Sequence, residues 1–341
     1  MTTDAKINNQ FSEDTLDDGD QVSGDNSPAY LSANERRRFL HGMVKTLPEP
    51  LQNRLTVLKN MQIEHIELER QLYEDIFNME KKYHEKLVPL YNKRKDIISG
   101  KLEPPAEEPK WKELDDSYTD LPMNYDFSSI MTLYRTTNEE TKGLPNFWLT
   151  VFKTSDRVSN WVYENDIPAL LKLNDVTIEY SQQSYTLGFH FDENDYFTNS
   201  VLTKQYFLKE TLDAEYPFSY DGPEVIKSIG CAIDWKEGKS LVQKQIEGGD
   251  GKDSRETVQL ASFFNLFDPP QYDENDDKID EELQVTILKD YELGQFLRDE
   301  LIPRAVLFFT GDFFEDTETY SEELSENEEE EKVTDECNGD V

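Results

Sequence analysis

The stretch that decides the fold is LQNRLTVLKNMQIEHIELERQLYEDIFNMEKKYHEKLVPLYNKRKDII, residues 51–98. Apolar side chains recur along it in steps of three and four residues, and the mean step lies near the period of about 3.5 residues that a coiled-coil seam shows. The stretch contains no glycine, and its other positions are dense in Glu, Lys, Arg and Gln, which favour helix. It therefore predicts one amphipathic helix, roughly 70 Å long at a rise of about 1.5 Å per residue.

A lone amphipathic helix of this length cannot bury its apolar stripe in water, so it needs a partner helix. The simplest partner is a second copy of the same chain, related by a two-fold axis. We therefore predict a homodimer held by the following residues: Leu51, Leu55, Leu58, Met61, Leu68, Leu72, Ile76, Met79, Tyr83 and Leu87. The alternative is a long structural helix that packs within a single chain.

Local signals place the ends of this helix and a shorter one before it. Pro89 predicts a kink or a break near the end of the long helix, and Gly100 marks its termination. Upstream, Ser32 and Glu35 have the spacing of a capping box, which predicts a short helix through about Lys45.

Beyond residue 127 the pattern becomes that of a globular domain, with a long helical pattern at each end and a period near two between them. We predict helices at 144–166 and 280–301, strands at 176–180, 185–191, 201–208 and 229–235, and a further hairpin around 248–251. The order predicts an α+β fold: a long dimerisation helix followed by a four-stranded antiparallel sheet with flanking helices. The predicted division is a disordered acidic N-terminus (1–31), a short helix plus the long helix (32–100), a connector (101–127), the α+β domain (128–311) and a disordered acidic tail (312–341).

The chain is strongly acidic, with a net charge of −37. Residues 312–341 account for −13 and residues 1–31 for −6, which leaves −18 for the remainder. This distribution argues against direct binding of nucleic acid or of an anionic membrane. It favours a strongly basic protein ligand, attracted over a long range. The plainer alternative is that the acidity only keeps the chain soluble.

The sequence gives no sign of a disulfide framework, a targeting segment or a catalytic centre. Cys231 and Cys337 are its only cysteines, and no apolar run approaches the length of a membrane span. The Gly238-Lys239 pair lacks the earlier glycine of a phosphate-binding loop, and no His, Cys or acidic group has metal-ligand spacing. We therefore predict no enzymatic activity, no cofactor and no metal.

Six stretches, taken together and in this order, resemble the nucleosome assembly protein family: GLPNFWLTVFKTSD (143–156), FHFDENDYFTNSVLTKQYFL (189–208), PFSYDGPE (217–224), GCAIDWKEGK (230–239), SFFNLFDPP (262–270) and LIPRAVLFFTG (301–311). The long helix, Pro89 included, is similar to the family's dimerisation helix. The resemblance implies a homodimer on a pair of antiparallel helices. It also implies a histone chaperone that binds core histones, chiefly the dimer that caps the nucleosome, together with linker histone as a further ligand, and that assists nucleosome assembly and disassembly without ATP. The location expected from it is nucleus and cytoplasm.

In this family histones bind an acidic concave surface, and an acidic tail contributes to the binding. Carried over to this sequence, the candidate histone-binding residues are Glu164, Asp166, Asp192, Glu193, Asp195, Asp273, Glu274, Asp276, Asp277, Glu322, Glu323, Glu326, Glu328, Glu329, Glu330 and Glu331. Each of them could equally be an ordinary solvated carboxylate. The aromatic residues of the motifs are interpreted as core: Phe147, Trp148, Phe263, Phe264 and Phe267.

The chain departs from the family pattern in the hairpin after the DWK motif. Residues 241–261 carry three basic residues against four acids, whereas the family's hairpin usually holds a lysine-rich cluster that can serve as an import signal. Two other functions stay open from the sequence: an acidic coiled-coil scaffold, and a chaperone or inhibitor of other basic proteins.

Overall fold

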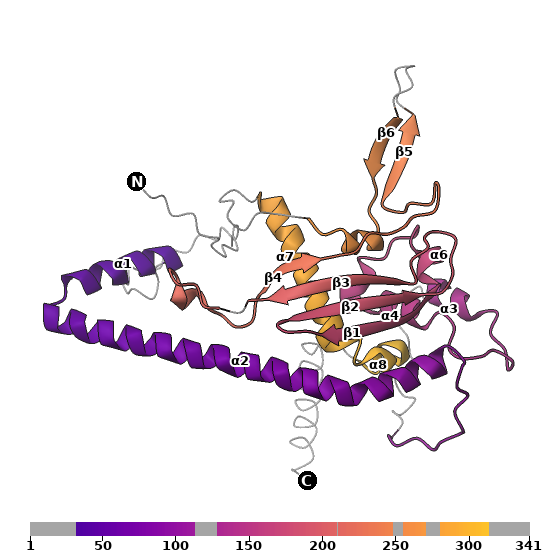
Figure 1. The fold of residues 1–341 in the computed structure, drawn as a ribbon, viewed down its shortest axis with the longest axis horizontal. Coiled ribbons are helices and arrows are strands. Elements are labelled where there is room, and N and C mark those ends of the chain that lie inside the picture. Colours follow the sequence, from indigo (N-terminus) through magenta and orange to yellow (C-terminus); the bar gives the residue numbers. More distant parts are fainter. Residues whose placement is uncertain (1–31, 113–127, 210, 248–254, 271–279, 314–341) are drawn as a thin grey trace, which may run out of the picture. The chain divides into compact units, whose positions relative to one another are not determined.

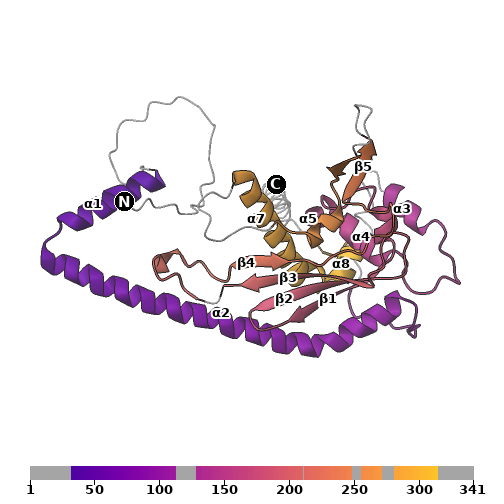
Figure 2. The ribbon, with the colours of Figure 1, turned by 45° about the horizontal axis from the view of Figure 1, so that its top comes forward.

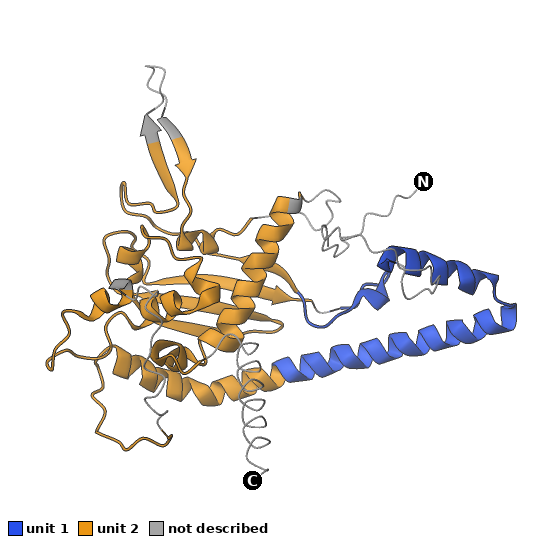
Figure 3. Ribbon diagram, turned by 180° about the vertical axis from the view of Figure 1, so that it is seen from behind, with its two compact units in different colours: residues 1–77, 210–224, 272–279 blue, residues 78–209, 225–271, 280–341 orange. Residues whose placement is uncertain are grey.

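The structure is a computed structural model that describes residues 32–112, 128–209, 211–247, 255–270 and 280–313. These residues fall into two compact units (Figure 3). The described part of unit 1 comprises residues 32–77 and 211–224, and unit 2 holds the rest. The predicted division at residues 100, 127 and 311 stays a prediction. The predictions for the termini, for most of the connector and for the acids at 273–277 lie outside the described residues.

Unit 1 contains helix α1 (Ala33–Thr46) and the first part of helix α2 (Glu49–Ile98). The predicted capping box at the start of α1 is confirmed, because the Ser32 hydroxyl accepts the Glu35 N–H while the Glu35 carboxylate accepts the Ser32 N–H. These hydrogen bonds from Ser32 lower the pKa of Glu35. Helix α1 has no buried residue.

Helix α2 is 50 residues long and continues through Pro89. The prediction of one long helix is therefore confirmed, and a break at the proline is excluded. Figures 1 and 3 show that the helix axis turns within its unit 2 segment, which contains Pro89. A kink is the expected response, because proline lacks the N–H of one helical hydrogen bond and its ring crowds the preceding turn.

Unit 2 is built on a four-stranded antiparallel sheet, as predicted (Figure 1). Its strands pair in chain order: β1 (Leu173–Tyr180), β2 (Ser184–Phe191), β3 (Val201–Leu208) and β4 (Val225–Ile229). Alternate side chains of β3 are buried, which is the pattern of a sheet with one covered face. A separate two-stranded hairpin, β5 (Gln243–Glu247) and β6 (Arg255–Gln259), confirms the hairpin predicted around residues 248–251.

Unit 2 also contains helix α7 and a set of short helices (Figure 2). They are α3 (Ser128–Tyr134), α4 (Phe147–Thr154), α5 (Asp156–Ser159), α6 (Ile167–Leu170), the 3-10 turn η4 (Phe263–Phe267), α7 (Glu281–Phe296), the π-helical turn η5 (Leu297–Leu301) and α8 (Ala305–Thr310). A further 3-10 turn, η3 (Pro217–Ser219), belongs to unit 1. All five motif aromatics interpreted as core are buried, which confirms that interpretation.

Two sequence predictions were wrong in detail. The helix predicted over 144–166 is divided, because Ser155 is extended and buried and separates α4 from α5. The fourth strand lies at Val225–Ile229 rather than 229–235. At Gly230 the chain runs so close to Phe267 that a Cβ atom would lie 1.8 Å from the Phe267 carbonyl oxygen. In the rest of the predicted strand, residues 231–235, Trp235 forms an isolated β-bridge to Phe197.

Candidate functional site

The best defined of the candidate acids lie on the loop that follows β2. Asp192, Glu193 and Asp195 are exposed, whereas Asn194 between them is buried. The Asn194 side-chain oxygen accepts the N–H groups of Tyr196 at 2.9 Å and of Phe197 at 3.0 Å. This local turn fixes the loop backbone, so that the buried amide holds three carboxylates at the surface.

The loop is also held from below. Lys236 donates its ammonium to the Asn194 carbonyl, and Asn174 donates to Asp192 at 2.7 Å. Phe197 packs edge-to-face against Phe191, and also against Trp235 and Phe264. Residues from three of the quoted motifs, together with Asn174 of β1, therefore converge behind the loop, where they support it. A rigid acidic surface binds a basic partner with little ordering cost.

Glu164 and Asp166, predicted together, have different environments. Glu164 is exposed in the turn between α5 and α6. Asp166 is fully buried: one carboxylate oxygen accepts the Ser262 hydroxyl at 2.6 Å, and the other accepts the N–H groups of Phe263 at 2.7 Å and Tyr163 at 3.1 Å. The choice of Asp166 as a surface contact was therefore wrong. Its carboxylate joins the α5–α6 turn to η4, and a carboxylate that accepts three hydrogen bonds is a structural group.

Other chosen acids lie outside the described residues: Asp273, Glu274, Asp276, Asp277 and the tail glutamates at 322, 323, 326 and 328–331. Within the described residues the candidate surface thus consists of Glu164, Asp192, Glu193 and Asp195. We call these four residues the exposed acid set. All four belong to unit 2.

The sequence interpretation missed a buried ion pair beneath the sheet. Lys204 of β3 is fully buried, with its Nζ atom 2.8 Å from both the Asp290 carboxylate and the Leu266 carbonyl oxygen. The other Asp290 oxygen accepts the Ser228 hydroxyl at 2.8 Å. Burial lowers the pKa of Lys204, and the charge of Asp290 opposes that shift. The sequence does contain a signal for the burial of Lys204, because this residue lies between Leu202 and Tyr206 on the inward-facing positions of an alternating strand.

The apolar stripe of α2 is uncovered. In unit 1, Leu51, Leu58, Met61, Leu68, Leu72 and Ile76 are exposed and Leu55 is half-buried; in unit 2, Met79, Tyr83 and Leu87 are exposed. A different face of α2 is the one that its own chain covers in unit 1. There Tyr220 contacts Tyr73 with ring centroids 6.5 Å apart, and Gly222 packs on the same ring.

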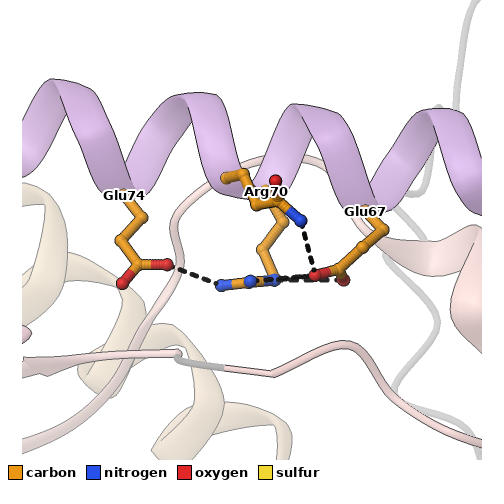
Figure 4. A network of polar contacts seen from close by, with 4 residues as sticks. Glu67, Arg70 and Glu74 are labelled. Atoms are coloured by element: carbon orange, nitrogen blue, oxygen red, sulfur yellow. Dashed lines mark hydrogen bonds and ion pairs between the residues drawn. The ribbon is translucent and has the colours of Figure 1, made fainter.

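The polar surface of α2 is held by helical ion pairs (Figure 4). Arg70 lies 2.9 Å from Glu67 and 3.1 Å from Glu74. The hydrogen bonds that Glu67 accepts from Arg70 and from Gln71 lower the pKa of Glu67. Pairs at this spacing stabilise a helix modestly, so α2 does not depend on the covering of its apolar stripe alone.

Neither a metal centre nor a membrane span emerges from the described part of the chain. Among these residues, no three His, Cys, Asp or Glu side chains are grouped so that they could hold a metal ion. No helix within them is both long enough and apolar enough to cross a membrane. The surface and fold thus define an acidic α+β protein whose longest helix leaves an apolar stripe uncovered.

Comparison with known proteins identifies the family to which this acidic α+β protein belongs. The model of the nucleosome assembly protein (NAP) family matches residues 53–312. The chain is 40% identical to Nucleosome assembly protein 1-like 1 of Xenopus tropicalis over 296 residues, 83% of this chain and 75% of that protein. It is 37% identical to human Nucleosome assembly protein 1-like 4 over 293 residues, 82% of this chain and 78% of that one. The chain belongs to the nucleosome assembly protein family.

A solved structure with the same kind of name is also similar. Nucleosome Assembly Protein 1 from Plasmodium knowlesi aligns over 78% of this chain and 99% of its own, with 26% sequence identity and a TM-score of 0.49.

Proposed function

We propose that this chain is a histone chaperone that binds core histones through acidic surfaces and assists nucleosome assembly and disassembly without ATP. Membership of the nucleosome assembly protein family is the observation that carries the proposal. The net charge of −37 agrees with it, because core histones are strongly basic ligands. The histone dimer that caps the nucleosome is the proposed main client, and linker histone a further one.

The proposed mechanism is competition for the DNA-binding surface of the histone. Histones bind bare DNA tightly because binding releases the counterions condensed on the phosphates. An acidic protein that occupies the same basic surface suppresses these contacts, and it releases the histone where the nucleosome offers a lower free energy. This mechanism needs no covalent step, so we propose no enzymatic activity. Exchange between nucleus and cytoplasm would suit such a carrier.

The exposed acid set is the proposed folded contact of unit 2. Three of its four members share one loop whose backbone Asn194 fixes, so they can meet Lys and Arg side chains without reordering. The acids at 273–277 and in the tail are proposed to add attraction over a longer range. Contact with the histone is thus divided between a fitted surface and flanking charge.

The chain is also proposed to be a homodimer. The uncovered stripe of α2 supports this, because exposed apolar side chains repeated along a helix are characteristic of a seam that a second helix covers. Replacing Leu72 and Ile76 by Asp should split the dimer, since each charge would be buried in the seam. Mass in solution, measured by light scattering, should fall by half. Leu288→Asp, an exposed apolar residue of α7, is the control and should leave the mass unchanged.

The proposed role of the exposed acid set in histone binding can be tested with two variants that lose the same amount of charge. Asp192→Asn, Glu193→Gln and Asp195→Asn together should weaken binding of the core-histone dimer about tenfold or more, as expected for several charge-assisted contacts. The control replaces Glu103, Glu107 and Glu108, three exposed acids of the connector, by Gln. Titration of labelled histone measures both. Equal weakening by the two triple variants would show that total charge matters and the loop does not.

A further inference from the structure

Helix α1 differs in charge from the chain as a whole. Its residues 33–46 include four Arg or Lys and one Glu, whereas the whole chain has a net charge of −37. All four basic residues are exposed: Arg36, Arg37, Arg38 and Lys45. This local reversal of sign gives an acidic ligand a place to bind on a chain whose net charge otherwise repels it.

The same helix exposes an apolar surface. Phe39, Leu40 and Met43 are 41–49% exposed, and α1 has no buried residue. Arg36, Leu40 and Met43 follow one another at spacings of four and three residues, so they share one side of the helix. A basic helix with an uncovered apolar side is suited to a ligand that combines carboxylates with apolar side chains.

The acidic tail of this chain has that combination. Residues 314–341 include thirteen Asp or Glu and one Lys, and Tyr320 and Leu324 stand among these acids. The tail comprises 28 residues, and an extended chain of that length spans roughly 95 Å. Because tail and helix belong to one chain, the effective concentration of the tail exceeds that of a separate acidic protein.

We propose that α1 is a docking site for the chain's own acidic tail, residues 314–341. The basic residues of α1 attract the carboxylates, and its exposed apolar side chains take Tyr320 and Leu324. Exposed ion pairs contribute little individually, so the tail is held weakly and is released readily.

The docked tail affects histone binding, and this consequence rests on the proposed function. A core histone is far more basic than α1, so it displaces the helix from the tail. A weakly basic protein competes with α1 less well. Helix α1 thus makes the tail less available to weakly basic proteins than to histones, which adds selectivity to a contact that charge alone would leave unselective.

Disulfide trapping tests the contact in the full-length chain, because the tail already contains Cys337. With Cys231→Ser in the background, His41→Cys adds a thiol at an exposed position of α1. Trp111→Cys is the control, since residue 111 is exposed and has a lysine on either side. Under a mild oxidant, the bond between residues 41 and 337 should form about tenfold faster than the bond between residues 111 and 337. Mass spectrometry of the digested chain measures both.

The difference in trapping rate should shrink at about 1 M salt, because the attraction is electrostatic. Equal rates at residues 41 and 111 near physiological salt would overturn the docking site.

Charge removal tests which residues hold the tail. Replacing Arg37, Arg38 and Lys45 by Gln should lower the trapping rate at residue 41 to that of the control site, while Gln keeps a good helix propensity. The matched variant replaces three exposed lysines of the connector by Gln: Lys101, Lys110 and Lys112. It should leave the trapping rate at residue 41 unchanged. Equal effects of the two triple variants would overturn the assignment to α1.

Histone titration of the same two triple variants separates this contact from the proposed function. The α1 variant should bind labelled core-histone dimer about threefold more tightly than the connector variant of equal charge, because its tail is no longer occupied. Equal affinities would overturn the competition between α1 and histone. If the native chain binds no histone while trapping at residue 41 persists, the proposed function fails and the docking site stands.

Discussion

At the scale of the residue, buried and exposed carboxylates have different roles in this chain. Asp166 and Asp290 are buried and accept several hydrogen bonds, whereas Asp192 and Asp195 are exposed on a fixed loop. Stability falls when a buried carboxylate loses its hydrogen-bond donors, and it also falls when buried donors lose that carboxylate. An exposed carboxylate is free to bind a ligand. Burial therefore separates the acids that stabilise the fold from those available to a basic protein.

Asp166→Ala should lower the free energy of unfolding by about 2–4 kcal/mol, because it leaves the Phe263 and Tyr163 N–H groups and the Ser262 hydroxyl without their acceptor. Glu164→Ala, two residues away and exposed, should change it by less than about 0.5 kcal/mol. Urea unfolding measures both. Equal losses from the two variants would contradict the structural role given to Asp166.

His84 gives the fold a pH dependence. Its ring packs against Tyr91 and Tyr180, and burial lowers its pKa below the ordinary value of 6.5. The unfolded chain therefore binds a proton first as the pH falls, so the stability that the neutral ring contributes is present above about pH 6.5 and is lost at lower pH. His84→Phe keeps the ring contacts and removes the titration.

The loss of unfolding free energy between about pH 7.5 and pH 5.5 should thus be smaller in His84→Phe than in the native chain. His41→Phe, at an exposed position of α1, is the control and should leave the loss unchanged. Urea unfolding at each pH measures it. An unchanged slope in His84→Phe would show that other groups cause the dependence.

At the scale of the element, α7 is held to the sheet through close approach as well as polar contacts. Tyr206 of β3 donates to the Asp290 carbonyl at 3.2 Å, and Gly294 lies so near that a Cβ atom would be 2.3 Å from the Tyr206 ring. The ion pair of Lys204 with Asp290 adds a charged contact between the same two elements. The docking of α7 on β3 thus depends on a residue without a side chain.

Gly294→Ala should therefore destabilise the chain by about 1–3 kcal/mol, despite the better helix propensity of alanine, because the ring of Tyr206 is buried and must move. Gly42→Ala in α1 has open space around the added methyl group and should stabilise by about 0.5–1 kcal/mol. Thermal unfolding of the two variants compares them. Stabilisation in both would show that α7 shifts without cost.

Elements with a clear period could be predicted from the sequence, and elements set by long-range contacts could not. The alternation of β3 gives Val201–Leu208 with its observed bounds, and the stripe of α2 gives its length. The displaced fourth strand depends on the approach of Gly230 to Phe267, which no local pattern shows. Likewise the sequence shows that residue 166 is an acid, but it does not show that Asp166 is buried and hydrogen-bonded to a turn almost a hundred residues away.

At the scale of the whole molecule, two kinds of surface remain for partners: apolar and acidic. The α2 stripe is suited to a second copy of the chain, and the exposed acid set to a basic protein. Because the two surfaces use different residues, we expect that dimerisation and histone binding can be impaired separately. The net charge of −37 affects both, since it attracts basic ligands and repels a second copy unless the α2 contact compensates.

The most direct test of the central claim is a competition titration on the full-length chain. Labelled core-histone dimer is bound near physiological salt and then displaced by an unrelated basic protein of matched net charge, and the titration is repeated at twice the salt. We predict tight histone binding that weakens with salt but resists the competitor, because the fixed acid loop adds fit to charge. Displacement at equal concentration, or no histone binding at all, would contradict a histone chaperone.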